Sequence, residues 1–147
     1  MVARVRELEI RYKPVRVTLP VSGRVTQPHD AALLASALLE DSTVERVLSL
    51  HFTSKHRLIG VHIVSVGTLD ASLVHPRDVF KAACLSNAAG LILAHNHPSG
   101  DPAPSQDDRD LVARLHRAGE LLGVDLLDAI IVTDTERYYS FKAAGVL

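Results

Sequence analysis

Cysteine is almost absent from this sequence, since Cys84 is the only one among 147 residues. A single thiol cannot form a disulfide within the chain, and it cannot build a zinc cluster of cysteines. Cys84 lies in a stretch of small apolar residues, and we interpret it as a small buried thiol.

An excess of positive charge and long hydrophobic runs are also missing. Lys and Arg number 16 against 17 Asp and Glu, for a net charge of −1, so no broad basic surface for nucleic acid is indicated. No apolar run approaches the roughly 20 residues needed to cross a bilayer. Residues 1–14 lack the uninterrupted apolar core of a secretory signal. We therefore expect a cytoplasmic protein without a membrane partner.

What the chain does have is enough apolar material for one domain. Hydrophobic residues make up 47% of it, which excludes wholesale disorder. A chain of this length suits a single domain, and such domains bury about two-thirds of their unfolded surface without needing a disulfide or metal.

Alternating strand and helix patterns predict an α/β or α+β layered domain. Residues 88–94 carry no polar side chain, so this strand is expected to be buried on both faces at the centre of a sheet. The other expected strands are 46–52, 58–66, 71–74, 124–132 and 138–141, and the expected helices are 28–40, 76–87 and 105–122. In the last helix one apolar stripe is predicted, formed by Leu111, Val112, Leu115, Ala118, Leu121 and Leu122.

Residues 1–28 form an N-terminal extension in this interpretation. Leu8, Ile10 and Tyr12 alternate with charged residues, a period of two that is typical of a half-buried strand. A second short strand is expected at 15–19. The oligomeric state stays open, although these strands could pair between two chains as a homodimer.

Two histidines follow the central strand in the segment His95-Asn96-His97-Pro98. At positions i and i+2 they can point to the same side. Asp108, in the first turn of the next helix, can supply a third ligand. Three protein ligands and a water are typical of catalytic zinc, which lowers the pKa of that water to about 7.

Other interpretations of these residues are open. Ser105 and Asp108 have the spacing of an ordinary helix cap, and a His-x-His pair also occurs in polar loops. Capping and ligation are compatible, because Ser105 can cap while Asp108 binds metal. Activation of water also needs a base that is not a ligand. The candidates are Glu45, Glu40, Asp101, Asp107 and Glu120. Spacing alone does not choose among them, although Glu45, at the start of the strand 46–52, could reach the open side of the metal.

His95-x-His97-Pro98 followed by Ser105-x-x-Asp108 resembles the JAMM signature of JAB/MPN+ metallopeptidases. The segments 66–83 and 95–102 resemble, more narrowly, the RadC family within that superfamily, and the resemblance extends over about residues 29–143. It implies a JAB/MPN-like, cytidine-deaminase-like fold for residues 29–147, a mixed β-sheet flanked by helices.

The resemblance also implies a site. One zinc ion per chain would be held by His95, His97 and Asp108. Ser105 would hydrogen-bond the oxyanion of the tetrahedral intermediate. Glu45 matches the place of the JAMM glutamate before a hydrophobic strand.

The sequence departs from the family in two places. RadC proteins often read Leu-Asp-His where this chain has Leu127-Asp128-Ala129, so a role that needs that histidine is in doubt. An N-terminal helix-hairpin-helix region, common in RadC proteins, has no room in this chain.

These features lead to three hypotheses. The first is a zinc hydrolase that cleaves an amide, peptide or isopeptide bond in a peptide or protein substrate. The second is a DNA-associated protein or nuclease, as the family's historical DNA-repair label suggests, although the net charge does not favour tight phosphate binding. The third is a non-catalytic interaction module, against which the retained ligand set argues.

Overall fold

A computed structural model describes residues 3–16, 24–39, 43–67 and 74–147 of the chain. The helices and strands in these ranges are α1 (Pro28–Leu39), β1 (Arg46–Phe52), β2 (Leu58–Val66), α2 (Pro76–Leu85), β3 (Gly90–Asn96), α3 (Gln106–Leu122), β4 (Asp125–Val132) and β5 (Tyr138–Ser140). Both the order and most of the bounds agree with the sequence-based prediction. None of the helices in the described ranges is long and apolar enough to cross a bilayer.

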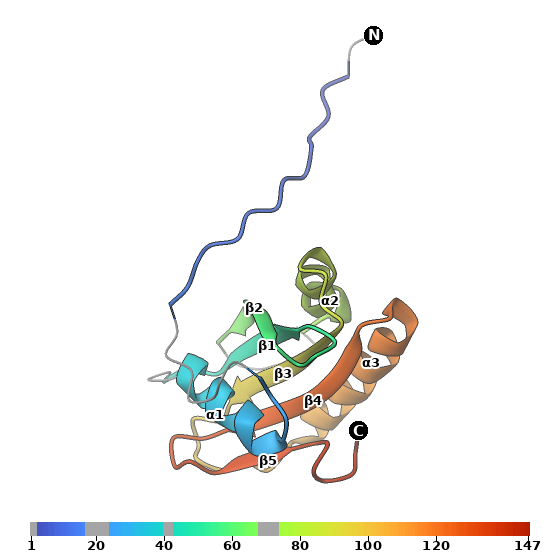
Figure 1. The fold of residues 1–147 in the computed structure, drawn as a ribbon. Helices are drawn as coiled ribbons and strands as arrows, with labels where there is room; N and C mark the ends of the chain where they lie inside the picture. The colour runs from blue at the N-terminus through green and yellow to red at the C-terminus, as the bar shows by residue number, and fades with distance from the viewer. Residues whose placement is uncertain (1–2, 17–23, 40–42, 68–73) are drawn as a thin grey trace.

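The five strands form one mixed sheet in the order β2-β1-β3-β4-β5 (Figure 1). β3 and β4 are parallel, with α3 as their crossover, and the other neighbours are antiparallel. α1 covers one face of the sheet, while α2 and α3 cover the other. The predicted layered α/β fold, a mixed sheet flanked by helices, is confirmed.

β3 lies at the centre of the sheet, and each of its residues is buried. Its apolar side chains alternate between two cores, Leu91 and Leu93 toward α2 and α3, Ile92 and Ala94 toward α1. The strand continues to Asn96, further than predicted, because its backbone stays paired with β4 as far as Val132. His95 is therefore the penultimate strand residue, not the first residue of a loop.

α3 begins and ends where the sequence predicts. Ser105 is its N-cap, and Gly123 ends it in the left-handed conformation, with φ of 69°. The predicted apolar stripe is wrong at its end, however, since Leu121 is 87% exposed and Leu122 52%. Gly119 is the last buried residue of α3, so the final helical turn extends beyond its contact with the sheet.

Two further predictions fail. Cys84 is exposed, not buried, because it lies on the outer side of α2, whose inner side presents Val79, Phe80 and Ala83. Residues 3–16 contain no strand, so the one expected at Leu8–Tyr12 does not form. This segment extends away from the domain (Figure 1), and no strand in the described ranges lies beside it to pair with its backbone or to cover its side chains.

Some expectations fall outside the described residues. These are most of the strands predicted at 15–19 and 71–74, and Glu40 as a candidate base.

Candidate metal centre

The two motif histidines lie at the end of β3 and at the first position after it. Their Nε2 atoms are 3.1 Å apart, and their rings have centroids 4.9 Å apart and planes inclined at 55°. His95 is almost fully buried, and the side chain of His97 is 14% exposed. Two ring nitrogens thus face each other at the edge of the core.

Asp108 reaches the same place from the first turn of α3. Its Oδ1 lies 3.2 Å from Nε2 of His95, and its Oδ2 lies 3.6 Å from Nε2 of His97. Oδ2 also accepts a hydrogen bond from the N–H of Ser105 (2.8 Å), and the Ser105 hydroxyl accepts one from the N–H of Asp108 (3.1 Å). The capping interpretation is thereby confirmed, and the same carboxylate faces both histidines.

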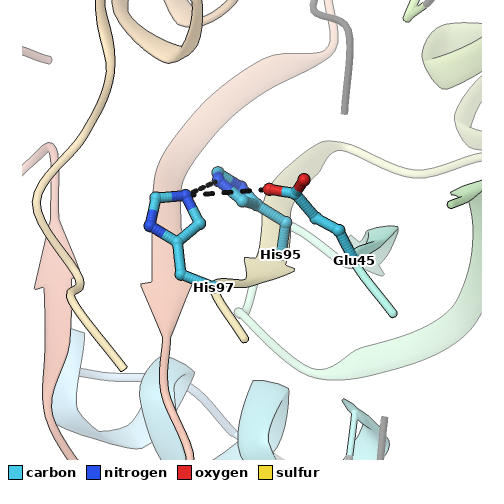
Figure 2. A group of neighbouring side chains, drawn as sticks. All are labelled: Glu45, His95 and His97. Carbon is cyan, nitrogen blue, oxygen red and sulfur yellow. Dashed lines mark hydrogen bonds and ion pairs between the residues drawn. The ribbon is translucent and has the colours of Figure 1, made fainter. Parts of the chain in front are cut away.

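Glu45 approaches from the opposite strand. β1 and β3 are antiparallel, and Val47 pairs with His95, so two residues further out Glu45 comes opposite His97. Glu45 Oε1 lies 3.8 Å from Nε2 of His97, and Figure 2 shows its carboxylate pointing toward the two imidazoles.

Three donor atoms, from Glu45, His95 and His97, lie within 4.8 Å of one another and could hold a metal ion. Asp108 lies against the same two nitrogens, so two carboxylates from different parts of the chain approach the histidines. The two carboxylates differ in exposure. The side chain of Asp108 is 1% exposed and that of Glu45 is 21% exposed.

The hydrogen bonds around the site fit a cation. Among the described residues, no well-aligned hydrogen bond reaches Oδ1 of Asp108, although this oxygen is buried. A buried carboxylate oxygen without a hydrogen-bond partner is costly unless it meets positive charge. Nδ1 of His97 lies 2.8 Å from the carbonyl oxygen of Asp101. Because a carbonyl only accepts, Nδ1 carries the hydrogen, and in the neutral ring Nε2 keeps its lone pair for a metal.

The ionisable side chains of the site shift one another's pKa values. The Asp108 carboxylate raises the pKa of His97, against the opposing effect of burial. Burial by itself would raise the pKa of Asp108, but His95, His97 and the N–H of Ser105 outweigh it and hold that pKa below its ordinary range. The carboxylate is therefore ionised in the folded protein, as a metal ligand has to be.

Other predicted candidates for the base lie elsewhere. Asp101 is exposed and its carboxylate accepts a hydrogen bond from the N–H of Ala103. Asp107 is exposed on α3, and Glu120 pairs with His116 at 3.9 Å in the second half of that helix. Among the described candidates, Glu45 is the one whose carboxylate lies near a motif histidine, with Oε1 3.8 Å from Nε2 of His97.

Two residues near the site were missed by the sequence analysis. The Asn96 side chain accepts from the N–H of Arg46 (2.7 Å) and donates to the carbonyl of Val44 (3.0 Å), the two neighbours of Glu45. The Arg137 guanidinium donates to the carbonyl of Gly100, in the loop that supports His97. Asn96 could have been noticed because it stands between the two histidines, whereas nothing in the sequence links Arg137 to this loop.

Ala129, which stands where RadC proteins often have a histidine, is a packing residue in this structure. Ala129 is 1% exposed, pairs with Leu93 of β3 and belongs to the core under α2 and α3. Its neighbour Asp128 is buried and accepts hydrogen bonds from the hydroxyl of Ser140 (2.6 Å) and the N–H of Lys142 (3.0 Å). Asp128 thus joins β4 to the segment after β5.

Comparison with known proteins gives several similar chains, all described as UPF0758 proteins. One from Methanosarcina mazei is 40% identical over 122 residues, which are 83% of this chain and 53% of that protein. One from Desulfitobacterium hafniense is 41% identical over 140 residues, 95% of this chain and 61% of the relative. One from Thermotoga maritima is 52% identical over 94 residues, 64% of this chain and 42% of the relative. The chain spans about half the length of the curated relatives it matches.

The family comparison covers more of this chain than the motif does. Residues 25–146 match the RadC-like JAB domain, from just before α1 to just after β5. The mixed sheet and its flanking helices are consistent with that match. The chain belongs to the RadC-like JAB domain family.

Proposed function

We propose that this chain is a zinc-dependent hydrolase of the JAMM type that cleaves an amide, peptide or isopeptide bond in a peptide or protein substrate. The observation that carries the proposal is the convergence of His95, His97 and Asp108, with Glu45 at the rim. Membership of a JAB family supports a hydrolase.

His95, His97 and Asp108 are proposed as the zinc ligands. Asp108 suits ligation better than Glu45, because it is the more deeply buried of the two and Oδ1 lacks a well-aligned hydrogen bond. A base has to reach water, which favours the more exposed Glu45 for that role. Bound zinc would supply Lewis-acid polarisation of the scissile carbonyl and a lowered pKa for water.

Glu45 is proposed as the general base. Its carboxylate would take a proton from the attacking water while the water oxygen bonds to the carbonyl carbon. The resulting carboxylic acid would then give that proton to the nitrogen of the leaving amine as the C–N bond breaks. The Glu45 carboxylate is thereby restored, and the products are a carboxylic acid and an amine.

Ser105 is proposed to donate a hydrogen bond to the oxyanion. Its Oγ accepts from the N–H of Asp108, so its own hydrogen is not used by that bond. Ser105 is exposed, and it stands at the start of the helix that carries Asp108. A hydroxyl in this place can therefore meet a substrate.

Metal analysis of the purified chain tests the site. We expect about one zinc per chain after loading and removal of excess, as for a single three-ligand site. Asp108→Ala should lose it, whereas Asp107→Ala, one residue earlier and exposed, should keep it. If the wild-type chain holds no zinc, the proposal is wrong.

The base is tested in a chain that still holds zinc. Glu45→Gln should keep its zinc but hydrolyse a peptide or isopeptide substrate about 10²- to 10⁴-fold more slowly, the usual contribution of a general base. Full activity in this variant would rule out Glu45 as the base. A zinc-loaded wild-type chain that cleaves DNA but no amide would overturn the proposed substrate class.

A further inference from the structure

We propose that Asn96 is the positioning residue of Glu45: it clamps the backbone on both sides of Glu45 and so holds the carboxylate opposite His97. The proposal rests on the function proposed above, because it concerns the base of that reaction. It gives a task to the residue between the two histidines.

The clamp begins where the β1–β3 ladder ends. The last paired residues of this ladder are Val47 and His95. The Asn96 side chain takes over at this point. Its Oδ1 accepts from the N–H of Arg46 (2.7 Å), and its Nδ2 donates to the carbonyl of Val44 (3.0 Å).

The carboxamide of Asn96 offers an acceptor and a donor side by side, so it can make both bonds at once. The N–H of Arg46 needs an acceptor and the carbonyl of Val44 needs a donor, so the two bonds also determine which way the amide is turned. Asn96 is 7% exposed, which limits competition from water. Successive strand side chains point to opposite faces, so Asn96 leaves the face of His95 and His97 to the metal site.

The backbone of Glu45 is also held from the other side. Its carbonyl accepts a hydrogen bond from the N–H of Gly67 (2.8 Å), just after β2. Asn96 adds the connection to the last residue of β3, which stands between the two histidines. The segment that provides two proposed ligands is thereby tied directly to the segment that provides the base.

Two substitutions separate the two bonds of the clamp. Asn96→Ala removes both, while Asn96→Asp keeps an acceptor for Arg46 but places an oxygen against the carbonyl of Val44. Thr133→Val is the matched control: Thr133 is a buried polar residue at the end of the neighbouring strand β4, and its hydroxyl bonds Thr135 and Arg137.

The position of Glu45 can be measured without a substrate. The chain is labelled with ¹³C at the glutamate carboxyl groups and loaded with Co²⁺. The ¹³C NMR signal of Glu45 is identified by its absence from the spectrum of Glu45→Gln. In the wild type we expect the paramagnetic Co²⁺ ion to displace the chemical shift of this signal strongly, because the carboxylate lies beside the proposed metal centre. Asn96→Ala and Asn96→Asp should lose about half of the displacement or more, while Thr133→Val should keep it. Zinc affinity should be similar in all four chains, because Asn96 is not a proposed ligand.

Hydrogen exchange at Arg46 tests the clamp in the metal-free chain. Its amide should exchange about tenfold faster in Asn96→Ala and near the wild-type rate in Asn96→Asp, which keeps the acceptor. An unchanged cobalt displacement in Asn96→Ala overturns the proposal. If the wild type shows no displacement at all, the metal centre proposed above fails instead. The clamp is then judged by the Arg46 amide, and an unchanged exchange rate in Asn96→Ala overturns it.

Discussion

Single residues in this chain serve a local structure and the candidate site at the same time. Asp108 closes the capping box of α3 with one oxygen and faces His95 with the other. Ser105 accepts the other bond of that box. A local helix signal and a metal site therefore use the same pair of residues, and a substitution has to be chosen so that the two effects can be told apart.

Ser105→Gly separates capping from catalysis. Glycine at an N-cap costs only a few tenths of a kcal/mol relative to serine, so stability and zinc content should stay close to those of the wild type. Loss of an oxyanion donor should lower kcat about 10²-fold or more. Steady-state kinetics and chemical denaturation measure the two effects. Ser105→Thr, which keeps a hydroxyl, should retain most of the activity, and a wild-type rate in Ser105→Gly would contradict the proposed role.

His51 is a buried histidine away from the candidate metal site. The Ser86 hydroxyl donates to the carbonyl of Ala83 (2.9 Å), so Nδ1 of His51 donates to Ser86 Oγ (3.0 Å). Its Nε2 then accepts from the hydroxyl of Ser49 (2.9 Å). These bonds suit the neutral ring, and burial together with the nearby His62 lowers the pKa of His51 from 6.5 to about 4.

The free energy of unfolding should therefore depend on pH through His51. Between pH 6.5 and about 4 the unfolded chain binds a proton at this position that the folded chain does not. Stability is then full above pH 6.5 and is lost as the pH falls, by about 1 kcal/mol per pH unit. Urea denaturation of the metal-free chain at pH 7 and pH 5 measures the loss. His51→Gln should show a smaller loss between these two pH values, and an equal loss would contradict the assignment.

At the scale of elements, α3 and β4 pack closely at one glycine. A Cβ built on Gly119 would lie 2.5 Å from the carbonyl oxygen of Val124, a backbone atom that cannot turn away. The same Cβ would lie 3.3 Å from the ring of Phe80 in α2. Gly119 thus allows the helix and the start of the strand to approach.

Gly119→Ala should destabilise the chain, although alanine favours a helix by about 1 kcal/mol over glycine. Overpacking at the contact with Val124 should outweigh this gain and leave a net loss of about 1–2 kcal/mol. Urea denaturation measures the change. Glu120→Ala, at the next and exposed position, should stay within about 0.5 kcal/mol of the wild type. A more stable Gly119→Ala would show that α3 can shift away from β4.

For the molecule as a whole, every helix and strand that the structure describes comes after residue 24. Among residues 3–16, Val5 is 88% exposed and Leu8 is 76% exposed. The segment touches the domain through a 3.4 Å hydrogen bond that the Tyr12 hydroxyl donates to the carbonyl of Leu85. This segment therefore contributes little buried apolar surface.

Deletion of residues 3–16 should change the free energy of unfolding by no more than about 0.5 kcal/mol, as expected for exposed side chains. Thermal and urea denaturation measure the change at two protein concentrations. A loss of about 2 kcal/mol or more would contradict the prediction, and a loss that grows with concentration would indicate that the segment pairs between two chains, as the homodimer hypothesis requires.

Most helices and strands and the histidine motif could be predicted from local patterns along the chain. β1, β2 and α3 begin and end as predicted, to within a residue, because periodicity, caps and glycine stops act over a few neighbouring residues. His95, His97 and Asp108 were recognised in the same way, by short spacing along the chain. Features that depend on contacts between residues far apart in the chain could not be predicted in this way.

Pairing of β1 with β3 brings Glu45 opposite His97, and it lets Asn96 bond the backbone of Val44 and Arg46, some 50 residues earlier. The same dependence explains the failures. Leu8 alternates with charged residues as in a strand, but no strand in the described ranges lies beside it, and Cys84 lies on the outer side of α2. A local pattern indicates which side of a helix or strand is apolar. Whether that side is buried, and how closely other residues approach it, depends on which other elements pack against it.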